Sequence, residues 1–351
     1  MASSISNDPH IVIFGAGSVG CWIGAAWMAS RLPVSFIGRE RIRREIDENG
    51  LTATDSEGRR IALRPDEVDF AMRPKALARA DIVALCVKSD DTAAAAKDIA
   101  KYAPRHAAVI SFQNGVGNVD ILKAALADRI VLHGMVPFNV ARLGNGRWHK
   151  GVSGTLWADD HDITRALDAR IGRGPGRMRL ASDMKGVLWG KLLINLNNAV
   201  NALSGRTLLE QLSDRDYRRV VAASQVEALD ILKAAGIEPA QIGPIPPRLL
   251  PHVIAAPNFL FRRLVLRLQK IDASARSSMA DDFAAGRPTE IDHLNGEVVR
   301  LAHSLGRRAP VNEAIVGLVR QAEAGVERIW TAAELSAFVL RRHKGAAGFG
   351  Y

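Results

Sequence analysis

The sequence predicts an α/β domain followed by an all-helical domain, and three observations support this. First, 351 residues exceed what one hydrophobic core usually accommodates, so two domains are expected. Second, short β-branched and aromatic runs alternate with helical patterns in the first half. Third, helical spacing dominates from Met184 onward. The predicted extents are 8–182, 183–340 and a mobile tail, rich in Gly and basic residues, at 341–351.

The composition is that of a globular protein, with 48% hydrophobic and 24% charged residues. No run of about 18 apolar residues is present, and residues 1–10 lack the apolar core of a signal peptide. Cys21 and Cys86 lie inside apolar segments and lack the spacing of metal ligands. We therefore expect a soluble cytoplasmic protein with no membrane partner and no metal site.

The charge balance, 47 basic against 37 acidic residues, raises the question of nucleic-acid binding. The basic residues are spread along the chain, with short clusters only at 39–44, 170–179 and 341–344. Only 5% of residues are aromatic, and no RNA-binding aromatic signature accompanies the clusters. We therefore expect an anionic cofactor and an anionic small substrate, and no nucleic-acid partner.

A glycine motif near the N-terminus predicts a Rossmann-type dinucleotide-binding domain. The apolar run 10–14 predicts a strand, and the apolar run that starts at Cys21 predicts a helix. Between them, a GxGxxG turn supplies backbone N–H groups for a pyrophosphate at the helix N-terminus. The predicted cofactor contacts are Gly15, Ala16, Gly17, Ser18, Val19 and Gly20. A glycine-rich turn without a ligand is the alternative.

The second predicted strand, 34–37, ends in Gly38-Arg39. An NAD-selective site usually has Asp or Glu near this place, to accept a hydrogen bond from the ribose 2′-hydroxyl. Arginine is only a donor, but it pairs with a 2′-phosphate, which favours NADP(H). The alternative is that Arg39 is a solvated surface residue.

Two further apolar runs, 80–87 and 106–112, predict parallel strands buried on both faces. Lys88 follows the first run, and Asn114 follows the second. Ligands of open α/β sheets bind beyond the carboxyl ends of strands, so both residues are candidate contacts. Either side chain could instead cap a helix or face water.

In the second half, Lys191, Asn195 and Asn198 have i, i+4 and i+7 spacing, so they share one face of a predicted helix. Asparagine is a poor helix former, and three occur within four positions at 195, 197 and 198. Apolar neighbours surround them, which indicates a buried helix with a polar stripe lining a cleft. A solvated face is the alternative.

A second polar element follows Gly286-Arg-Pro288, which ends the preceding helix. Thr289 is predicted to cap a new helix, with Asp292 completing a box-like start. Glu290 then lies in the first turn. Its role is either catalytic or only to stabilise the helix dipole.

Taken together, these motifs resemble the 2-dehydropantoate 2-reductase (ketopantoate reductase) family. The similar segments are GAGSVG, Arg39, CVK, QNGVG, the helix LWGKLLINLNN at 188–198, SSMADD at 277–282 and RPTEID at 287–292. The resemblance extends from about residue 10 to residue 325. It implies a Rossmann-type domain, a helical domain and an active site in the cleft between them.

The resemblance also implies roles for individual residues. Lys191 would be the general acid and Glu290 its acidic partner. Asn195, Asn198 and Ser278 would contact substrate, while Lys88 and Asn114 would lie near the nicotinamide ribose. Asn197 and Asn201 compete with Asn198, because the second asparagine falls one residue early. The stretch 135–139, MVPFN, also differs from the family's Thr-rich segment, which leaves the exact 2-oxo acid open.

The chemistry of such a reduction agrees with these residues. Hydride added to a ketone carbon leaves negative charge on oxygen, so the site needs a proton donor, and a lysine beside a carboxylate meets that need. The expected function is NADPH-dependent reduction of 2-dehydropantoate in pantothenate biosynthesis. A β-hydroxyacid dehydrogenase-like enzyme for another 2-oxo acid and a non-catalytic NADP(H) sensor are the alternatives. The apolar helices could pack within the chain or between copies, so a homodimer is a candidate assembly.

Overall fold

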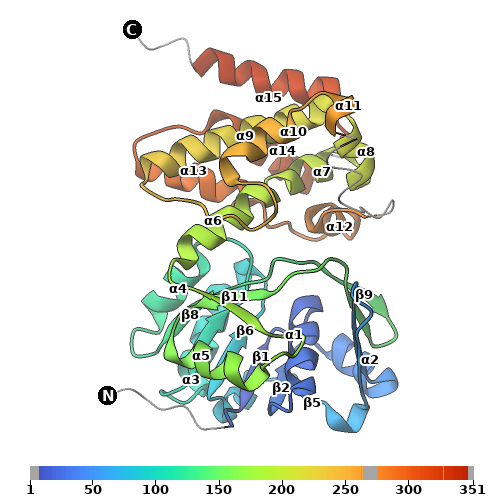
Figure 1. The fold of residues 1–351 in the computed structure, drawn as a ribbon, viewed down its shortest axis with the longest axis vertical. Coiled ribbons are helices and arrows are strands. Elements are labelled where there is room, and N and C mark those ends of the chain that lie inside the picture. The colour runs from blue at the N-terminus through green and yellow to red at the C-terminus, as the bar shows by residue number, and fades with distance from the viewer. Residues whose placement is uncertain (1–7, 262, 264–274, 327, 347–351) are drawn as a thin grey trace. The chain divides into compact units, whose positions relative to one another are not determined.

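The computed structural model describes residues 8–261, 263, 275–326 and 328–346 (Figure 1). The chain forms two compact units, Met1–Met184 and Lys185–Tyr351. The first combines sheets with helices, and the described residues of the second are helical apart from turns and loops. This confirms the predicted fold class. Within the described residues, no helix has the length and apolarity needed to cross a membrane.

The main sheet of the first unit has the order β12-β11-β8-β7-β6-β1-β2-β5. Its strands are β1 (Ile11–Phe14), β2 (Val34–Ile37), β5 (Asp69–Ala71), β6 (Ile82–Leu85), β7 (Ala108–Ser111), β8 (Val131–Met135), β11 (Leu156–Asp159) and β12 (Met178–Ala181). The strands from β8 to β5 pair in parallel, and β11 pairs antiparallel with β8. The parallel part has the strand order of the Rossmann fold, whose order reverses between β1 and β6.

Helices cover both faces of this sheet. They are α1 (Ser18–Ala29), α2 (Glu40–Asn49), α3 (Thr92–Tyr102), α4 (Asn118–Ala125) and α5 (Asp162–Ile171), with 3-10 turns at Pro65–Glu67, Pro74–Arg79 and Ser89–Asp91. Alternate residues of β1 enter different cores, Ile11 and Ile13 on one side and Val12 and Phe14 on the other. Burial on both faces explains why the central strands are almost entirely apolar.

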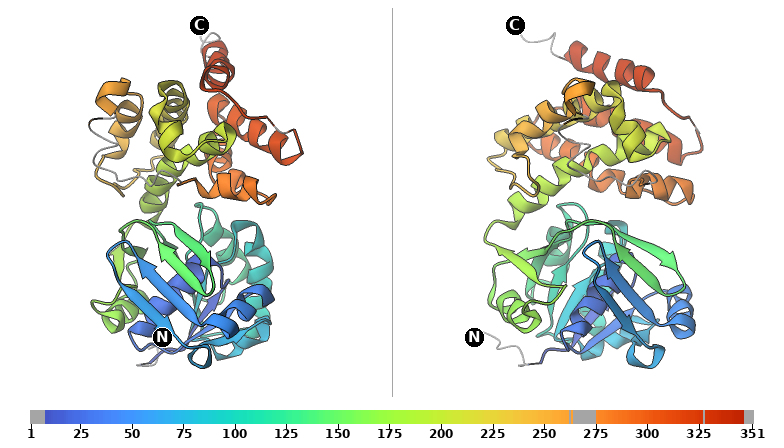
Figure 2. Two further views of the ribbon diagram at one scale, coloured as in Figure 1. Left: turned by 90° about the vertical axis from the view of Figure 1, so that its right-hand side faces the viewer. Right: turned by 45° about the vertical axis from the view of Figure 1, so that its right-hand side comes forward.

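A second sheet of four strands, which the sequence analysis did not predict, lies against α1 (Figure 2). It has the order β4-β3-β10-β9, formed by β3 (Leu51–Asp55), β4 (Arg60–Leu63), β9 (Val140–Gly144) and β10 (Arg147–Lys150). Trp22 of α1 donates its indole N–H to the carbonyl of Thr54, 3.1 Å away. Helix α1 is therefore packed between two sheets.

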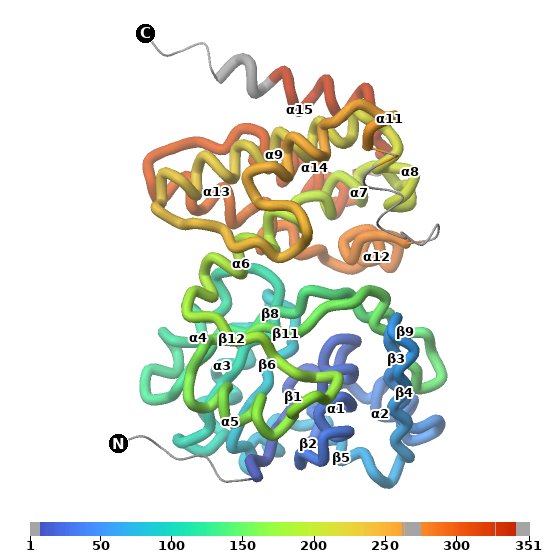
Figure 3. The backbone as a smooth tube through the Cα atoms, viewed as in Figure 1, coloured from blue at the N-terminus to red at the C-terminus, as the bar shows by residue number. Residues whose placement is uncertain are grey.

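The second unit is a helical domain (Figure 3). Its helices are α6 (Met184–Asn195), α7 (Asn197–Ser204), α8 (Leu208–Ser213), α9 (Arg215–Ala234), α10 (Leu250–Ile254), α11 (Asn258–Phe261), α12 (Ser278–Ala284), α13 (Asn295–Ser304), α14 (Pro310–Glu323) and α15 (Ala332–Ala346), with 3-10 turns at Pro247–Leu249 and Ile291–His293. The long helix α9 packs against α10, α13, α14 and α15. Val220 and Val221 of α9 are completely buried in the core of this unit.

Two predictions for this unit need correction. The expected single helix through 198 is interrupted at Leu196, which separates α6 from α7, and Ile194 is 42% exposed rather than buried. The tail predicted from Arg341 begins as helix, since α15 continues to Ala346. The stretch from Ala332 to Ala346 consists largely of good helix formers, which explains the continuation. Residues 347–351 lie outside the described residues.

Candidate active site

The glycine turn between β1 and α1 has the geometry of a dinucleotide cradle. Gly15 has φ +107°, and a Cβ there would lie 2.5 Å from the backbone nitrogen of Val87. A Cβ on Gly20 would lie 2.3 Å from the carbonyl oxygen of Gly15. Gly17 differs, because a Cβ there would have no heavy atom of the described residues within 4 Å. Protein packing therefore explains Gly15 and Gly20, while Gly17 borders open space.

The start of α1 offers hydrogen-bond donors to that space. Among the described residues no side chain caps this end of the helix, and its first turn contains no acidic residue. The N–H groups of Gly15 and Ala16 are already bonded to the carbonyl of Ile37, at 3.0 and 2.9 Å. The donors at the helix N-terminus, with their partial positive charge, suit an anionic pyrophosphate, so this turn meets the requirements of the predicted cofactor.

Arg39 lies at the carboxyl end of β2, where it is exposed and precedes the first turn of α2. Its neighbours along α2 differ, because Arg43 pairs with Asp47 at 2.7 Å and Arg44 pairs with Glu40. No partner is recorded for Arg39 among the described residues. An exposed guanidinium at this strand end has the placement required of a 2′-phosphate ligand.

Lys88 and Asn114 leave the sheet side by side. The parallel register pairs Leu85 of β6 with Ser111 of β7, and each predicted residue follows its strand by the same number of positions. Lys88 is exposed and Asn114 is partly buried. The structure thus places both at the carboxyl edge of the sheet, next to the strand-order reversal where α/β sheets bind ligands.

A buried polar network, not anticipated from the sequence, joins these two loops. It consists of Ser89, Thr92, Ser111, Gln113 and Asn118, each at most 6% exposed. Ser111 donates to Oε1 of Gln113 at 2.9 Å, and the amide of Gln113 donates to Thr92 at 2.7 Å. Ser89 and Asn118 both donate to the backbone carbonyl of Asn114. Satisfied networks of this kind hold loops in one conformation.

The MVPFN stretch that departs from the expected Thr-rich segment is part of the core of the first unit. Met135 is completely buried, and Phe138 is 5% exposed. Phe138 packs edge-on against Trp22, with ring centroids 5.0 Å apart, and Nζ of Lys150 lies 4.4 Å from its ring centroid. Nζ of Lys150 also donates to the carbonyl of Gly154 at 2.6 Å, and burial lowers the pKa of this amine. Packing therefore explains why this stretch is apolar.

Lys191 is a lysine of the second unit whose pKa departs strongly from its ordinary value. Burial lowers the pKa of its amine to about 8, and the Glu290 carboxylate acts in the opposite direction, raising it. The lysine lies on α6, which buries Trp189, Leu192 and Leu193. An amine whose pKa lies near neutrality exchanges protons readily at physiological pH.

The predicted asparagines divide into two groups. Asn201 is completely buried and structural, since its Oδ1 accepts from the backbone N–H of Ser277 at 2.9 Å and its amide donates to the carbonyl of Arg206 at 3.0 Å. Asn195, Asn197 and Asn198 are only partly buried. Oδ1 of Asn197 is buried, and no described residue forms a hydrogen bond with it. Because the side chain of Asn201 is already hydrogen-bonded inside the domain, Asn197 and Asn198 stay as the candidates for the second substrate contact.

The two adjacent serines have different roles. Ser277 caps α12, accepting from the N–H of Ala280 at 3.2 Å, and it donates to the carbonyl of Asn198 at 3.1 Å. Ser278 is the first residue of α12 and is exposed. The cap fixes α12 against α7, so Ser278 and Asn198 belong to neighbouring, connected segments.

Glu290 does not lie in the first turn of an α-helix, contrary to the prediction. It precedes a 3-10 turn, Ile291–His293, and α13 begins only at Asn295. Thr289 accepts from the N–H of Ile291 at 3.3 Å, whereas Asp292 pairs with Arg320 at 2.7 Å and does not complete a box. The ion pair with α14 outweighs the local capping pattern, and the partly buried Glu290 instead acts on Lys191.

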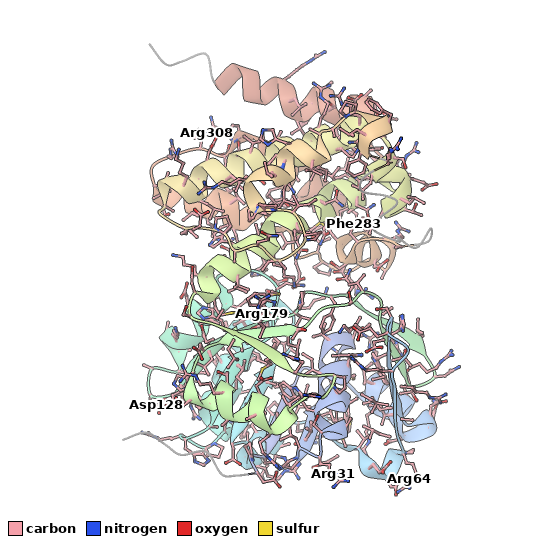
Figure 4. The ribbon with its side chains drawn as sticks, in the orientation of Figure 1. Arg31, Arg64, Asp128, Arg179, Phe283 and Arg308 are labelled. Atoms are coloured by element: carbon pink, nitrogen blue, oxygen red, sulfur yellow. The ribbon has the colours of Figure 1, made fainter. Side chains whose placement is uncertain are left out.

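The basic surface is distributed rather than concentrated. Arg31, Arg64 and Arg308 lie in separate turns and loops and point outward (Figure 4). Arg64 pairs with Asp66 at 3.1 Å, and Arg308 pairs with Glu313 at 2.7 Å. The basic side chains are thus spread over the surface, as their distribution along the sequence indicated, and some of them are paired with carboxylates.

Two family models match most of the chain. The model described as ketopantoate reductase PanE/ApbA matches residues 11–162, and the model of the C terminal of the same proteins matches residues 183–323. The 2-dehydropantoate 2-reductase of Halobacterium salinarum is 27% identical over 323 residues, which are 90% of this chain and 99% of that protein. That of Pyrobaculum aerophilum is 30% identical over 217 residues, 60% of this chain and 68% of that protein.

Solved structures agree with these matches. The PanE/ApbA family ketopantoate reductase from Ralstonia eutropha JMP134 has a TM-score of 0.75 at 26% identity, covering 90% of this chain and 99% of its own. D-mandelate dehydrogenase, solved with NADH and anilino(oxo)acetate, has a TM-score of 0.72 at 20% identity, covering the same shares. The second likeness concerns the fold alone.

Proposed function

The chain belongs to the ketopantoate reductase family and is an oxidoreductase, as the sequence motifs predicted, and from this premise we propose that it reduces 2-dehydropantoate to pantoate with NADPH. The observation that supports this proposal most directly is Lys191, an amine with a pKa of about 8 beside Glu290. Family members and structural neighbours use a nicotinamide dinucleotide. The proposed reaction belongs to pantothenate and coenzyme A biosynthesis.

Lys191 is proposed to be the general acid. The reduced nicotinamide, when bound, supplies a hydride to the 2-oxo carbon. Lys191 donates a proton from Nζ to the carbonyl oxygen, which becomes the hydroxyl, and the neutral amine regains a proton from solvent. With a pKa of about 8 the amine is mostly protonated at pH 7 yet releases its proton more easily than an ordinary lysine. Glu290 keeps it charged.

The remaining predicted contacts are proposed to bind and orient the reactants. Gly15 to Gly20 would hold the pyrophosphate, Arg39 the 2′-phosphate, and Lys88 and Asn114 the nicotinamide ribose. Asn195, Asn198 and Ser278 would bind the oxo acid. Partly exposed amides and hydroxyls are suited to the carboxylate and hydroxyl groups of such a substrate.

A related reductase of another 2-oxo acid is the second candidate. The observation that leaves it open is the stretch MVPFN at 135–139, which differs from the family's Thr-rich segment. A panel of 2-oxo acids, with aliphatic and aromatic side chains, separates the two candidates. A non-catalytic NADP(H) sensor predicts tight NADPH binding with no turnover on the whole panel.

We also propose that the protein acts in the cytoplasm and as a homodimer. The two cysteines are unpaired, and desolvation raises the pKa of both thiols, that of Cys86 to about 12. Thiols of this kind agree with a reducing compartment. A ketopantoate reductase from Staphylococcus aureus, similar in fold at 16% identity, is described as dimeric. Light scattering of the purified chain measures the assembly.

The test of the proposed function is the loss of NADPH absorbance on adding 2-dehydropantoate, with NADH in a parallel cuvette. We expect rapid oxidation of NADPH and slow oxidation of NADH. Lys191→Ala is the control protein, and it should lose turnover by about 10²–10⁴-fold while binding NADPH normally. Near-normal turnover of this variant contradicts the mechanism. If neither NADPH nor NADH is oxidised, 2-dehydropantoate is not the substrate, and the panel of 2-oxo acids is tested next.

A further inference from the structure

Helix α9 presents three buried polar side chains, Ser224, Gln225 and Glu227, within one turn. They are 0%, 2% and 8% exposed. Polar side chains are costly to bury, and a helix that only packed in a core would use apolar residues at these positions. Ser224 and Glu227 both bond to α14, whereas Gln225 bonds to α6, so the polar side chains of this turn connect α9 with two other helices.

Gln225 is bonded to the helix of Lys191. Its Nε2 donates to the backbone carbonyl of Leu193, 3.0 Å away. Leu193 is in the last turn of α6, just before the interruption at Leu196. Carbonyls in the last turn of a helix lose their helical partners and need others. Gln225 therefore binds the end of α6 two residues beyond Lys191.

The other amide atom of Gln225 makes this contact informative. Its Oε1 is buried and has no hydrogen-bond partner among the described residues. Such an atom opposes folding, and an apolar side chain of the same length would avoid the cost. The donor function of the amide toward Leu193 is thus the structural reason for a glutamine here.

A second contact fixes α6 on the other side of Lys191. The N–H of Ala240 donates to the carbonyl of Gly186 at 2.8 Å. Gly190 makes this approach possible, because a Cβ there would lie 2.0 Å from the carbonyl oxygen of Ala240. With Gln225 at Leu193, the helix is held before and after the lysine.

The same helix α9 supports the segment that follows Glu290. Ser224 donates to Oδ1 of Asn312 at 2.7 Å, and the amide of Asn295 donates to the same oxygen at 3.0 Å. Glu227 accepts from the N–H groups of Val311 and Asn312 at 2.9 and 2.8 Å. Asn295 begins α13, which follows the turn after Glu290. One helix therefore supports both the lysine and its carboxylate.

We propose that Gln225 is a positioning residue for Lys191, holding the end of α6 in register with Glu290 through the carbonyl of Leu193. This inference rests on the proposed function of Lys191. It assigns no contact with substrate or cofactor to Gln225. The requirement it meets is geometric, since a displacement of about 1 Å in a catalytic group can reduce its rate about 10²-fold.

Gln225→Met tests the proposal, because methionine keeps the length of the side chain and removes the donor. Gln211→Met is the matched control: Gln211 of α8 is completely buried, and neither polar atom of its amide has a partner in the part of the chain that the structure describes. We expect Gln225→Met to lower kcat about tenfold, with KM for the oxo acid and Kd for NADPH changed by less than about twofold. Gln211→Met should leave all three constants unchanged.

The pH profile separates positioning from general destabilisation. Burial is the larger influence on the pKa of Lys191. If Gln225→Met loosens α6 and water reaches the amine, this pKa should rise. The decline of kcat at basic pH should then begin above about pH 8. If Gln225→Met has the same kcat as the wild type, and its kcat declines at the same basic pH, the proposal is overturned. An equal loss of kcat in Gln211→Met also overturns it, because the effect is then one of packing.

A second variant and a second measurement cover the remaining outcomes. Gln225→Glu donates to Leu193 only when protonated, so the ratio of its kcat to that of the wild type should rise as the pH falls; a flat ratio contradicts the proposal. If the wild type reduces no oxo acid, the proposed function fails, and the Lys191 amine can still be titrated by NMR after ¹³C reductive methylation. An unchanged titration in Gln225→Met then overturns the positioning role.

Discussion

The side-chain amide of Gln113 donates a 2.7 Å hydrogen bond to the hydroxyl of Thr92, and both residues are buried. This bond fastens the loop after β7 to the start of the helix that follows β6. Lys88 and Asn114, the proposed ribose contacts, lie on the two loops that it joins. The spacing between them therefore depends on a side-chain contact that neither loop makes alone.

Thr92→Val should weaken cofactor binding. The substitution leaves the amide of Gln113 and Oδ1 of Asn118 each short of one partner. We expect a loss of about 1–3 kcal/mol in the free energy of unfolding and a several-fold higher Kd for NADPH. Fluorescence titration measures the Kd. Thr164→Val, which removes another completely buried hydroxyl in α5, should destabilise the protein without changing the Kd. If Thr92→Val and Thr164→Val bind NADPH with the same Kd, the buried polar network does not affect cofactor binding.

Arg39→Ala should reduce selectivity for NADPH. Loss of a charge-assisted contact with the 2′-phosphate removes about 1.5–3 kcal/mol, so kcat/KM with NADPH falls about tenfold or more while kcat/KM with NADH stays constant. Steady-state kinetics with both cofactors measure the ratio. Arg41→Ala, at an exposed position in the first turn of α2, is the control and should retain the wild-type ratio. A parallel loss with NADH would assign Arg39 a role other than reading the phosphate.

The pH dependence of kcat/KM should report the ionisation of Lys191. The acid must be protonated, so activity is present below the pKa of about 8 and is lost as the pH rises through it. Glu290→Gln removes the influence that raises this pKa, and the limb should move to lower pH. Asp292→Asn, whose carboxylate pairs with Arg320, should leave the limb in place. If the decline of kcat/KM at basic pH is unchanged in Glu290→Gln, Glu290 is not the partner of Lys191.

Gly190→Ala should destabilise the second unit. The added Cβ would lie 2.0 Å from the carbonyl oxygen of Ala240, and overpacking of this kind costs about 1–3 kcal/mol. Gly317→Ala in α14 meets no atom within 4 Å, so it should instead stabilise the protein by up to about 1 kcal/mol through helix propensity. Urea denaturation of the two variants measures the difference. A neutral effect of Gly190→Ala would mean that the 240 segment can move away.

The elements predicted well are those whose signal is local. Strands β1, β2, β6 and β7 are apolar runs buried on both faces, and the GxGxxG turn identifies the first helix. The pairing of Lys191 with Glu290 was implied by the resemblance of the motifs that contain them, and their electrostatic coupling agrees with it. The confirmed family follows from these local motifs.

Features that depend on distant partners were missed. The second sheet requires β3 to pair with β10, and neither segment shows a strong apolar run. The predicted box at Thr289 and Asp292 was wrong because Arg320, far along the chain, pairs with Asp292. Likewise, nothing local marks Gln225, whose partner is the carbonyl of Leu193.

The small sheet also has a consequence for the rate of folding. β3 pairs antiparallel with the neighbouring β4, so this hairpin can form early. The pairing of β3 with β10 joins segments such as Thr54 and His149, which are 95 positions apart, and such a contact must await the closure of a long loop. Until β10 docks, one edge of β3 is unpaired and Trp22 lacks part of its cover. A refolding experiment that follows tryptophan fluorescence should therefore show the burial of Trp22 among its slow events.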